Sequence, residues 1–342
     1  MSDGAMLVEA AERLIGNRID DAAMRRARAG EWLAAEWDAL AGMGLPLALV
    51  DEDAGGFGVA PEDAFALVRL TGRHALPLPL AETMVANHAL GRAGLPLAER
   101  AAVLIDGADL TVSAEDKGWR LSGTAARVPW GRDIGTLVVV HAGRVFRLDT
   151  GWAIAEAGTN LAAMPRDTLA IDARCDVAGT ANGLSALQMG AVIRTLQIAG
   201  ALERVLELTV GFVSERVQFG KPLSKFQAVQ HDLARLGGEV AAAGAAADMA
   251  VEAFVGDPAR AALPIAAARI RTGEAAGVAA GIAQQLHGAI GFTAEHRLHW
   301  YTTSLWSWRD EYGGQRYWTD MLGTATFTAG GAGFWQFVTE AA

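Results

Sequence analysis

The stretch ERVQFGKPLSKFQAVQHDLARL, residues 215–236, sets a basic turn between two helix-like runs. Its glycine and proline interrupt the helical pattern, because both residue types are unfavourable inside a helix. Arg216 carries a planar, always-charged group that suits phosphate oxygens, and Phe219 and Phe226 offer flat surfaces to an aromatic ring system. The alternative is a helix C-terminus with a favourable cation near its dipole, followed by a restart at the proline. These residues alone leave both interpretations open.

The chain on either side of this stretch changes its hydrophobic period twice. Residues 7–97 repeat apolar side chains at helical spacing, around a loop rich in glycine. Residues 101–179 form short, β-branched runs separated by turns, and the helical period returns after residue 182. Further helices are expected from about Lys225, Leu263, Ala294 and Gln315.

The expected fold class is therefore α+β with several domains. An N-terminal α-helical domain would occupy residues 1–100, and a small, reduced antiparallel β domain residues 101–180. A C-terminal antiparallel four-helix bundle would occupy residues 181–342, because long helices with short connections pack in this way.

Composition excludes several classes of function. The net charge of -10 repels phosphate polyanions, and no basic stripe interrupts it, so we expect no nucleic-acid binding. Cys175 is the only cysteine, which excludes an internal disulfide and fits a reducing, cytoplasmic compartment. No signal peptide is recognisable, and no apolar run reaches the roughly 18 residues of a membrane span. His296 and His299 have metal-like spacing without an evident third ligand, so no metal site is expected.

A second stretch, AQQLHGAIGFTAEHRLHWY at residues 283–301, also combines a helix end with bare backbone. The pattern predicts that a helix ends at His287. The glycines at 288 and 291 and the alanine between them leave the main chain open to the approach of another molecule.

Together the two stretches resemble the acyl-CoA dehydrogenase family. The family pattern Arg-x-Gln-Phe-Gly-Lys-Pro-x-x-x-Phe-Gln-x-x-x-x-x-Leu-Ala is matched by Arg216, Gln218, Phe219, Gly220, Lys221, Pro222, Phe226, Gln227, Leu233 and Ala234. The pattern Gln-x-His-Gly-Gly-x-Gly-Phe is matched by Gln285, His287, Gly288, Gly291 and Phe292, with Ala289 in place of the second glycine. The N-terminal segment LVDEDAGGFGVAPEDAFALVRLTGRHALPLPLAET is similar too, so the resemblance covers nearly the whole chain and implies the family's α, β, α fold.

The resemblance implies an enzyme that binds FAD and oxidises an acyl-CoA thioester to the trans-2-enoyl-CoA. A base removes the Cα proton, the flavin accepts the Cβ hydride, and an electron-transferring flavoprotein receives the electrons. It also implies that the first motif reaches the FAD of a neighbouring subunit, while the second presents main chain to its pyrophosphate and adenosine portion. The implied flavin contacts are Arg216, Gln218, Phe219, Phe226, Gln227, Gln285, Leu286, Gly288 and Ala289.

The base must be a carboxylate in a desolvated pocket, because its substrate is a very weak carbon acid. The resemblance implies Glu274, on the helix before the second motif, as the first candidate, and Glu311 as the second. Glu311 lies one residue away from the family's alternative position, which Tyr312 occupies. The alternatives are a surface pair of Glu274 with Arg271, and a solvated charge cluster around Glu311.

The chain departs from the family where the β domain begins. A Thr-Glu-Pro-x-x-Gly-Ser-Asp segment, whose groups meet the flavin in the family, has no counterpart between Pro77 and Thr111. This reduction resembles one subunit of α2β2 heterotetramers from the bacterial catabolism of steroids and other bulky acids. Three hypotheses follow: a competent dehydrogenase of fatty acyl or steroid side-chain thioesters, as a homotetramer or α2β2 heterotetramer; a non-catalytic or half-site partner subunit; and a flavin-dependent oxidase or monooxygenase.

Overall fold

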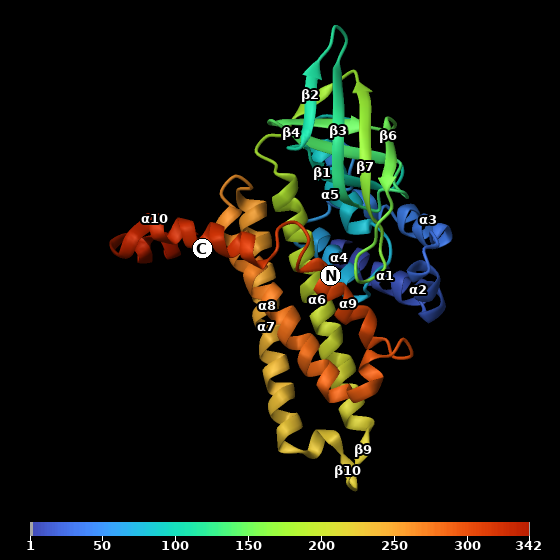
Figure 1. Cartoon of the computed structure of the whole chain (residues 1–342), viewed down its shortest axis with the longest axis vertical. Helices are drawn as coiled ribbons and strands as arrows, with labels where there is room; N and C mark the ends of the chain where they lie inside the picture. The colour runs from blue at the N-terminus through green and yellow to red at the C-terminus, as the bar shows by residue number, and fades with distance from the viewer. Residues whose placement is uncertain (1–2, 342) are drawn as a thin grey trace. The chain divides into compact units, whose positions relative to one another are not determined.

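The computed structural model describes residues 3–341, which separate into two compact units (Figure 1). Unit 1 comprises residues 3–68 and 76–193, and unit 2 comprises residues 69–75 and 194–341. Two helices, α4 (Pro61–Arg73) and α6 (Ala186–Glu215), contribute to both units. The predicted domain boundaries at residues 100 and 180 remain a prediction. The two compact units divide the chain at other residues and do not test them.

Unit 1 begins with short helices, as the apolar period predicts. Pro61 opens α4, where its fixed backbone angle suits the first helical turn. The wholly helical N-terminal region consists of α1 (Asp3–Arg18), α2 (Asp21–Arg28), α3 (Ala34–Gly42), the 3-10 helices η1 (Leu45–Leu47) and η2 (Glu52–Ala54), α4 and α5 (Leu80–Arg92).

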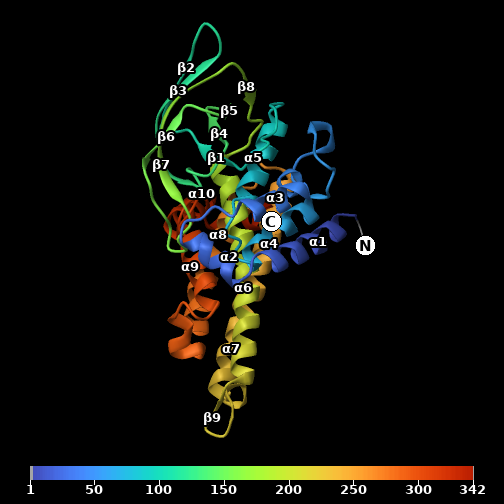
Figure 2. The ribbon, with the colours of Figure 1, turned by 90° about the vertical axis from the view of Figure 1, so that its right-hand side faces the viewer.

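Two four-stranded sheets complete unit 1 (Figures 1 and 2). One has the strand order β1-β4-β5-β8 and the other the order β2-β3-β7-β6. The strands are β1 (Ala102–Asp106), β2 (Leu110–Ala114), β3 (Trp119–Pro129), β4 (Thr136–His141), β5 (Arg144–Leu148), β6 (Trp152–Glu156), β7 (Arg166–Cys175) and β8 (Ala178–Thr180).

The expectation of a purely antiparallel β domain is wrong at one strand pair. β1 pairs with β4 in parallel, with Ala102 opposite Thr136 and Asp106 opposite Val140. Parallel neighbours need a long crossover connection, and here the chain builds β2 and β3 of the other sheet between them. The pattern of short apolar runs predicts the strands but not which strands pair.

Buried side chains join the helices of unit 1 to its sheets. The core between the sheets contains Leu121, Leu137, Phe146 and Leu169, all fully buried. On α5, the Thr83 hydroxyl accepts a hydrogen bond from the backbone N–H of Ala102 at 3.1 Å. The α5 helix is therefore tied directly to the first strand.

Unit 2 is helical, and its helix positions agree closely with those expected. Its long neighbours α7 (Gln227–Gly256) and α8 (Ala262–His287) are joined by a short connection and pack against each other. The remaining elements are β9 (Val217–Gln218), β10 (Lys221–Pro222), the 3-10 helices η3 (Leu223–Lys225) and η4 (Gly288–Phe292), α9 (Leu298–Trp308) and α10 (Gln315–Ala341). The prediction that a helix ends at His287 is confirmed.

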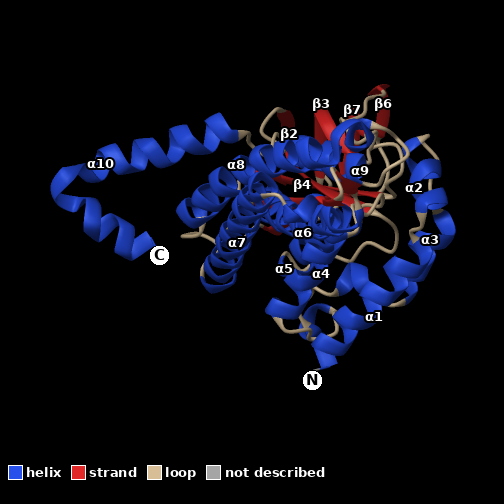
Figure 3. Ribbon diagram, turned by 90° about the horizontal axis from the view of Figure 1, so that it is seen from below, coloured by secondary structure: helices blue, strands red, loops and turns tan. Residues whose placement is uncertain are grey.

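The last helix bends sharply, as Figure 3 shows. Gly330 has φ 66° and ψ 170°, so α10 consists of two helical segments that meet at this residue. Within residues 3–341, none of the helices combines the length and the apolar character that crossing a membrane requires.

Candidate functional site

The first motif forms a tight hairpin between α6 and α7, at one end of the unit 2 helices (Figure 1). Lys221 pairs with Gln218, and Pro222 with Val217. The two residues at the tip, Phe219 and Gly220, have φ values of 51° and 82°. Positive φ at both central positions is typical of the turns that close two-residue hairpins, and it is uncommon for phenylalanine. The hairpin therefore holds an aromatic side chain at its tip.

The side chains of this hairpin face solvent. Phe219 is 91% exposed, and its ring meets that of Phe226 edge to face, with the centroids 6.2 Å apart. The Lys221 ammonium lies 4.3 Å from the centroid of the Phe226 ring. Arg216 is exposed, and no acidic side chain of the described residues pairs with it. The exposed Phe219 ring beside the half-buried Phe226, and a cation without an acidic partner among the described residues, fit a phosphate-bearing, aromatic ligand.

The second motif exposes main chain at the end of α8. Gly288 has φ 63° and ψ -145°, and nothing lies within 4 Å of the position a Cβ would take there. Ala289 and Gln285 are exposed, and Leu286 is half-buried. This backbone is open to the approach of a ligand, as the glycine pattern predicts.

A cluster of rings packs the second motif on α6, the helix that leads into the first motif. Phe212, in the last turns of α6 before the hairpin, stacks on His287, with centroids 4.4 Å apart and an interplanar angle of 22°. The His296 ring lies 4.7 Å from that of His287. The His287 Nδ1 lies 2.8 Å from the carbonyl oxygen of Ala283, to which it donates as the N–H tautomer. The end of α8 is thus packed directly on the helix that carries the hairpin.

This ring cluster should make the end of α8 sensitive to acid. Burial lowers the pKa of His287 and that of His296 below the ordinary value of 6.5. Because folding favours the neutral imidazoles, their contribution to stability is complete above pH 6.5 and is lost as the pH falls through the folded-state pKa values. Lowering the pH from 7.5 to 5.5 is expected to reduce amide protection in residues 284–293, because protonation of the two imidazoles disfavours their buried packing.

Hydrogen exchange corrected for its intrinsic pH dependence measures this loss. His287→Asn preserves a side-chain donor without an ionisable ring, so its protection should depend less on pH. His231→Gln, at an exposed position on α7, is the matched control and should behave as the wild-type chain does. An equal pH dependence in His287→Asn and the wild type would contradict the assignment to this cluster.

The two candidate bases lie in very different surroundings. The side chain of Glu274 is 50% exposed and pairs with Arg271 at 2.9 Å. This is the surface pair that the alternative interpretation predicted. Arg271 also pairs with Glu239, so Glu274 belongs to an ion-pair group on the α7 and α8 surfaces. Solvent screens the charges of such a group, so the half-exposed Glu274 carboxylate lacks a desolvated pocket.

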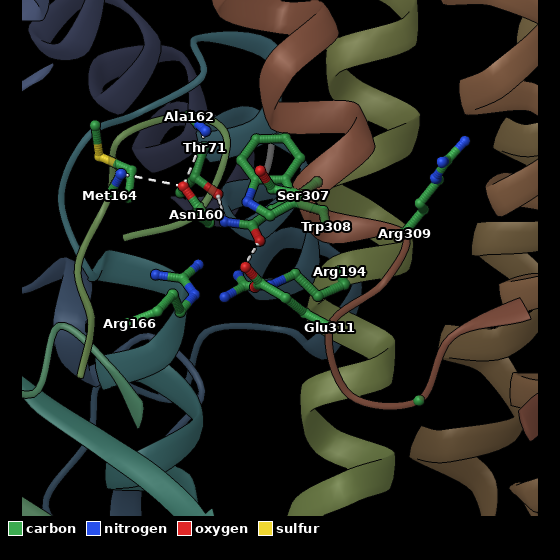
Figure 4. A network of polar contacts seen from close by, with 12 residues as sticks. Thr71, Asn160, Ala162, Met164, Arg166, Arg194, Ser307, Trp308, Arg309 and Glu311 are labelled. Carbon is green, nitrogen blue, oxygen red and sulfur yellow. Dashed lines mark hydrogen bonds and ion pairs between the residues drawn. The ribbon is translucent and has the colours of Figure 1, made fainter. Parts of the chain in front are cut away.

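Glu311 is buried in the loop between α9 and α10, which contradicts the alternative of a solvated charge cluster. Its side chain is 7% exposed, and its Oε2 accepts a hydrogen bond from Nε of the fully buried Arg194 at 2.7 Å (Figure 4). The Arg194 guanidinium also lies 5.4 Å from the centroid of the Tyr312 ring. Of the two candidates, Glu311 meets the requirement for a desolvated carboxylate.

Sequence reasoning missed the groups that hold Glu311. Arg194 on α6 also bonds Gln197 at a short distance, and Gln197 donates to the Thr71 hydroxyl at 3.0 Å. A second buried arginine, Arg269 on α8, contacts the backbone of the loop itself. A signal was available, because Arg194 is the only charged residue between Ala186 and Leu202 in a strongly apolar helix. Charged residues in such helices are rarely buried unless they are paired.

The order of helical, β and helical segments defines a class of folds that solved structures share. The ChsE4–ChsE5 complex from Mycobacterium tuberculosis matches with a TM-score of 0.84 and 21% identity, covering 96% of this chain and 98% of that chain. The Tcur3481–Tcur3483 steroid ACAD variant matches with a TM-score of 0.86 and 25% identity, covering 96% and 99%. The predicted fold class is confirmed.

Sequence comparisons identify the family. The model of the acyl-CoA dehydrogenase C-terminal domain matches residues 178–326. Acyl-CoA dehydrogenase IpdE2 of Mycobacterium tuberculosis is 30% identical over 307 residues, which cover 86% of this chain and 88% of that protein. This chain belongs to the acyl-CoA dehydrogenase family, whose members typically bind FAD.

Proposed function

We propose that this chain takes part in the FAD-dependent α,β-dehydrogenation of an acyl-CoA thioester, with Glu311 as the base that removes the Cα proton. The observation that carries the proposal is the burial of the Glu311 carboxylate against Arg194. This assignment moves the role from Glu274, whose exposed carboxylate lacks the desolvation that the reaction requires.

The residues around Glu311 support a base of this kind. Burial disfavours a charged carboxylate, whereas the opposite charge of Arg194 compensates for it. A carboxylate that is ionised in this setting can accept the Cα proton. The Arg194 contact also fixes the side-chain direction, since a guanidinium bonds carboxylates with a defined geometry. Proton transfer from carbon depends strongly on such alignment.

FAD, when bound, supplies the acceptor for the Cβ hydride, and its electrons then pass to an electron-transferring flavoprotein. Groups of the two motifs would hold it: the Arg216 guanidinium at phosphate oxygens, Phe219 and Phe226 at a ring, and the main chain at Gly288 and Ala289 near the pyrophosphate. Because Arg216, Phe219, Gly288 and Ala289 are exposed in this chain, they suit a cofactor shared with a second subunit.

A half-site partner subunit is the second candidate function. The missing Thr-Glu-Pro-x-x-Gly-Ser-Asp segment favours it, because the family uses this segment at the flavin ring. Two structural relatives carry paired chain names, ChsE4–ChsE5 and Tcur3481–Tcur3483, and the second is described as a steroid ACAD. By this analogy, the assembly would be an α2β2 heterotetramer acting on a steroid-derived thioester, and this chain would complete the partner's flavin site.

The visible absorption spectrum of the chain purified alone, together with its native mass, tests these candidates. About one FAD per subunit in a homotetramer would support a self-sufficient dehydrogenase. In that case acyl-CoA thioesters should bleach the flavin absorption. A colourless chain that gains flavin and turnover only with a second family member would support the half-site function. A chain that takes up no flavin in either setting would contradict both.

A further inference from the structure

Arg269 lies at the centre of a cluster of main-chain oxygens. It lies in the first half of α8 and is 2% exposed. Its Nη2 atom lies 2.8 Å from the carbonyl oxygen of Glu311 and 3.1 Å from those of Trp308 and Arg309. The carbonyl oxygen of Gly313 lies 3.2 Å away. The last carbonyls of a helix lack partners within it, so Arg269 satisfies both the end of α9 and the loop that follows.

A second contact holds the same loop from the side of α10. The indole N–H of Trp318 donates to the carbonyl oxygen of Gly313 at 2.9 Å, with that of Tyr312 at 3.2 Å. Tyr312 and Gly313 have φ values of 52° and 84°. A Cβ on Gly313 would lie 2.7 Å from the Trp318 Nε1. The loop therefore has a strained, closely packed conformation that needs external support.

The burial of the charged Arg269 side chain beside Arg194 is electrostatically unfavourable. Burial and the nearby charge of Arg194 lower the pKa of Arg269 to about 10, so its side chain still carries a positive charge at neutral pH. Its Nε and Nη1 are buried without a hydrogen-bond partner in the described part of the chain. Buried charged groups of this kind often contribute no more stability than apolar packing of similar volume. The contacts of Arg269 with the loop carbonyls therefore distinguish it from an apolar residue at this place.

We propose that Arg269 is a positioning residue, which fixes the main chain of Glu311 so that the carboxylate stays aligned with the substrate's Cα. The inference rests on the proposed role of Glu311 as base. Arg194 orients the side chain of Glu311, and Arg269 orients the backbone on which that side chain stands. Alignment errors of about 1 Å reduce enzymatic rates by as much as about 100-fold, which gives the scale of the effect.

The test uses Arg269→Lys and Arg269→Gln in the assembly that turns over acyl-CoA. Hydrogen exchange of residues 309–314 reports on the loop directly, and kcat and KM report on catalysis. For Arg269→Gln we expect exchange at least about tenfold faster and kcat about 10- to 100-fold lower, with KM nearly unchanged. Arg269→Lys should lie between this variant and the wild type, because lysine keeps the charge but reaches fewer carbonyls. Arg316→Lys, whose side chain is 95% exposed beyond the loop, is the matched control and should leave all readouts unchanged.

The outcomes separate this inference from the proposed function. Unchanged hydrogen exchange of residues 309–314 in Arg269→Gln would show that Arg269 does not hold this loop, and would overturn the inference. Faster exchange with unchanged kcat would overturn the positioning role, and turnover retained in Glu311→Gln would in addition show that the proposed base is wrong. If Arg269→Gln does not fold, Gly313→Ala perturbs the same loop without changing charge, and the same lower kcat and faster exchange are expected.

Discussion

Glu311→Gln is expected to lower kcat by about 10²- to 10⁴-fold, because glutamine keeps the size of the side chain but cannot accept a proton. It also leaves Arg194 without its ionic partner, so the thermal midpoint should fall. Turnover must therefore be measured well below that midpoint and normalised to folded protein. Flavin content should stay the same, since the cofactor motifs lie at other positions.

Two companion variants make this result specific. Glu311→Asp retains the charge opposite Arg194 but withdraws the carboxylate by one methylene, so it should preserve most of the stability and still lose activity. Glu274→Gln removes an exposed charge and should change kcat by less than about twofold, as surface pairs contribute little. Loss of turnover in Glu274→Gln with activity retained in Glu311→Gln would return the role of base to Glu274.

Arg216→Ala is expected to weaken FAD binding by about 10- to 100-fold, the effect of losing a charge-assisted hydrogen bond to phosphate. Titration of the apoprotein assembly with FAD, followed by fluorescence, gives the dissociation constant. Since Arg216 is exposed and pairs with no acid of the described residues, its removal should leave the thermal midpoint of the apoprotein unchanged. The loss is thus attributable to the ligand.

Matched variants distinguish the effect of the Arg216 guanidinium on FAD affinity from the effect of a positive charge alone. Arg216→Lys keeps the charge but loses the planar fork, and should recover only part of the affinity. Arg235→Ala removes another exposed arginine, on α7, and should bind FAD as the wild type does. Equal affinity of Arg216→Ala and the wild type would contradict a phosphate contact at this hairpin.

Local sequence signals predicted much of the fold because they depend on neighbouring residues. The helical period predicted α6 to α10, and the glycine after His287 predicted the end of α8. The break at residues 217–222 follows from glycine and proline chemistry in the same way. The parallel pairing of β1 with β4 could not be predicted, because it depends on how distant strands meet.

The sequence by itself determined the family, the helical and β segments and the places of the two motifs, since each depends on residues close together in the chain. Only the tertiary structure decided which carboxylate is desolvated. Glu311 and Arg194 are separated by more than a hundred residues, and burial depends on the side chains that other helices bring around them. The same contacts placed Arg269 on the loop beside Glu311 and left Glu274 at the surface, because α8 turns one face to the interior and the other to solvent.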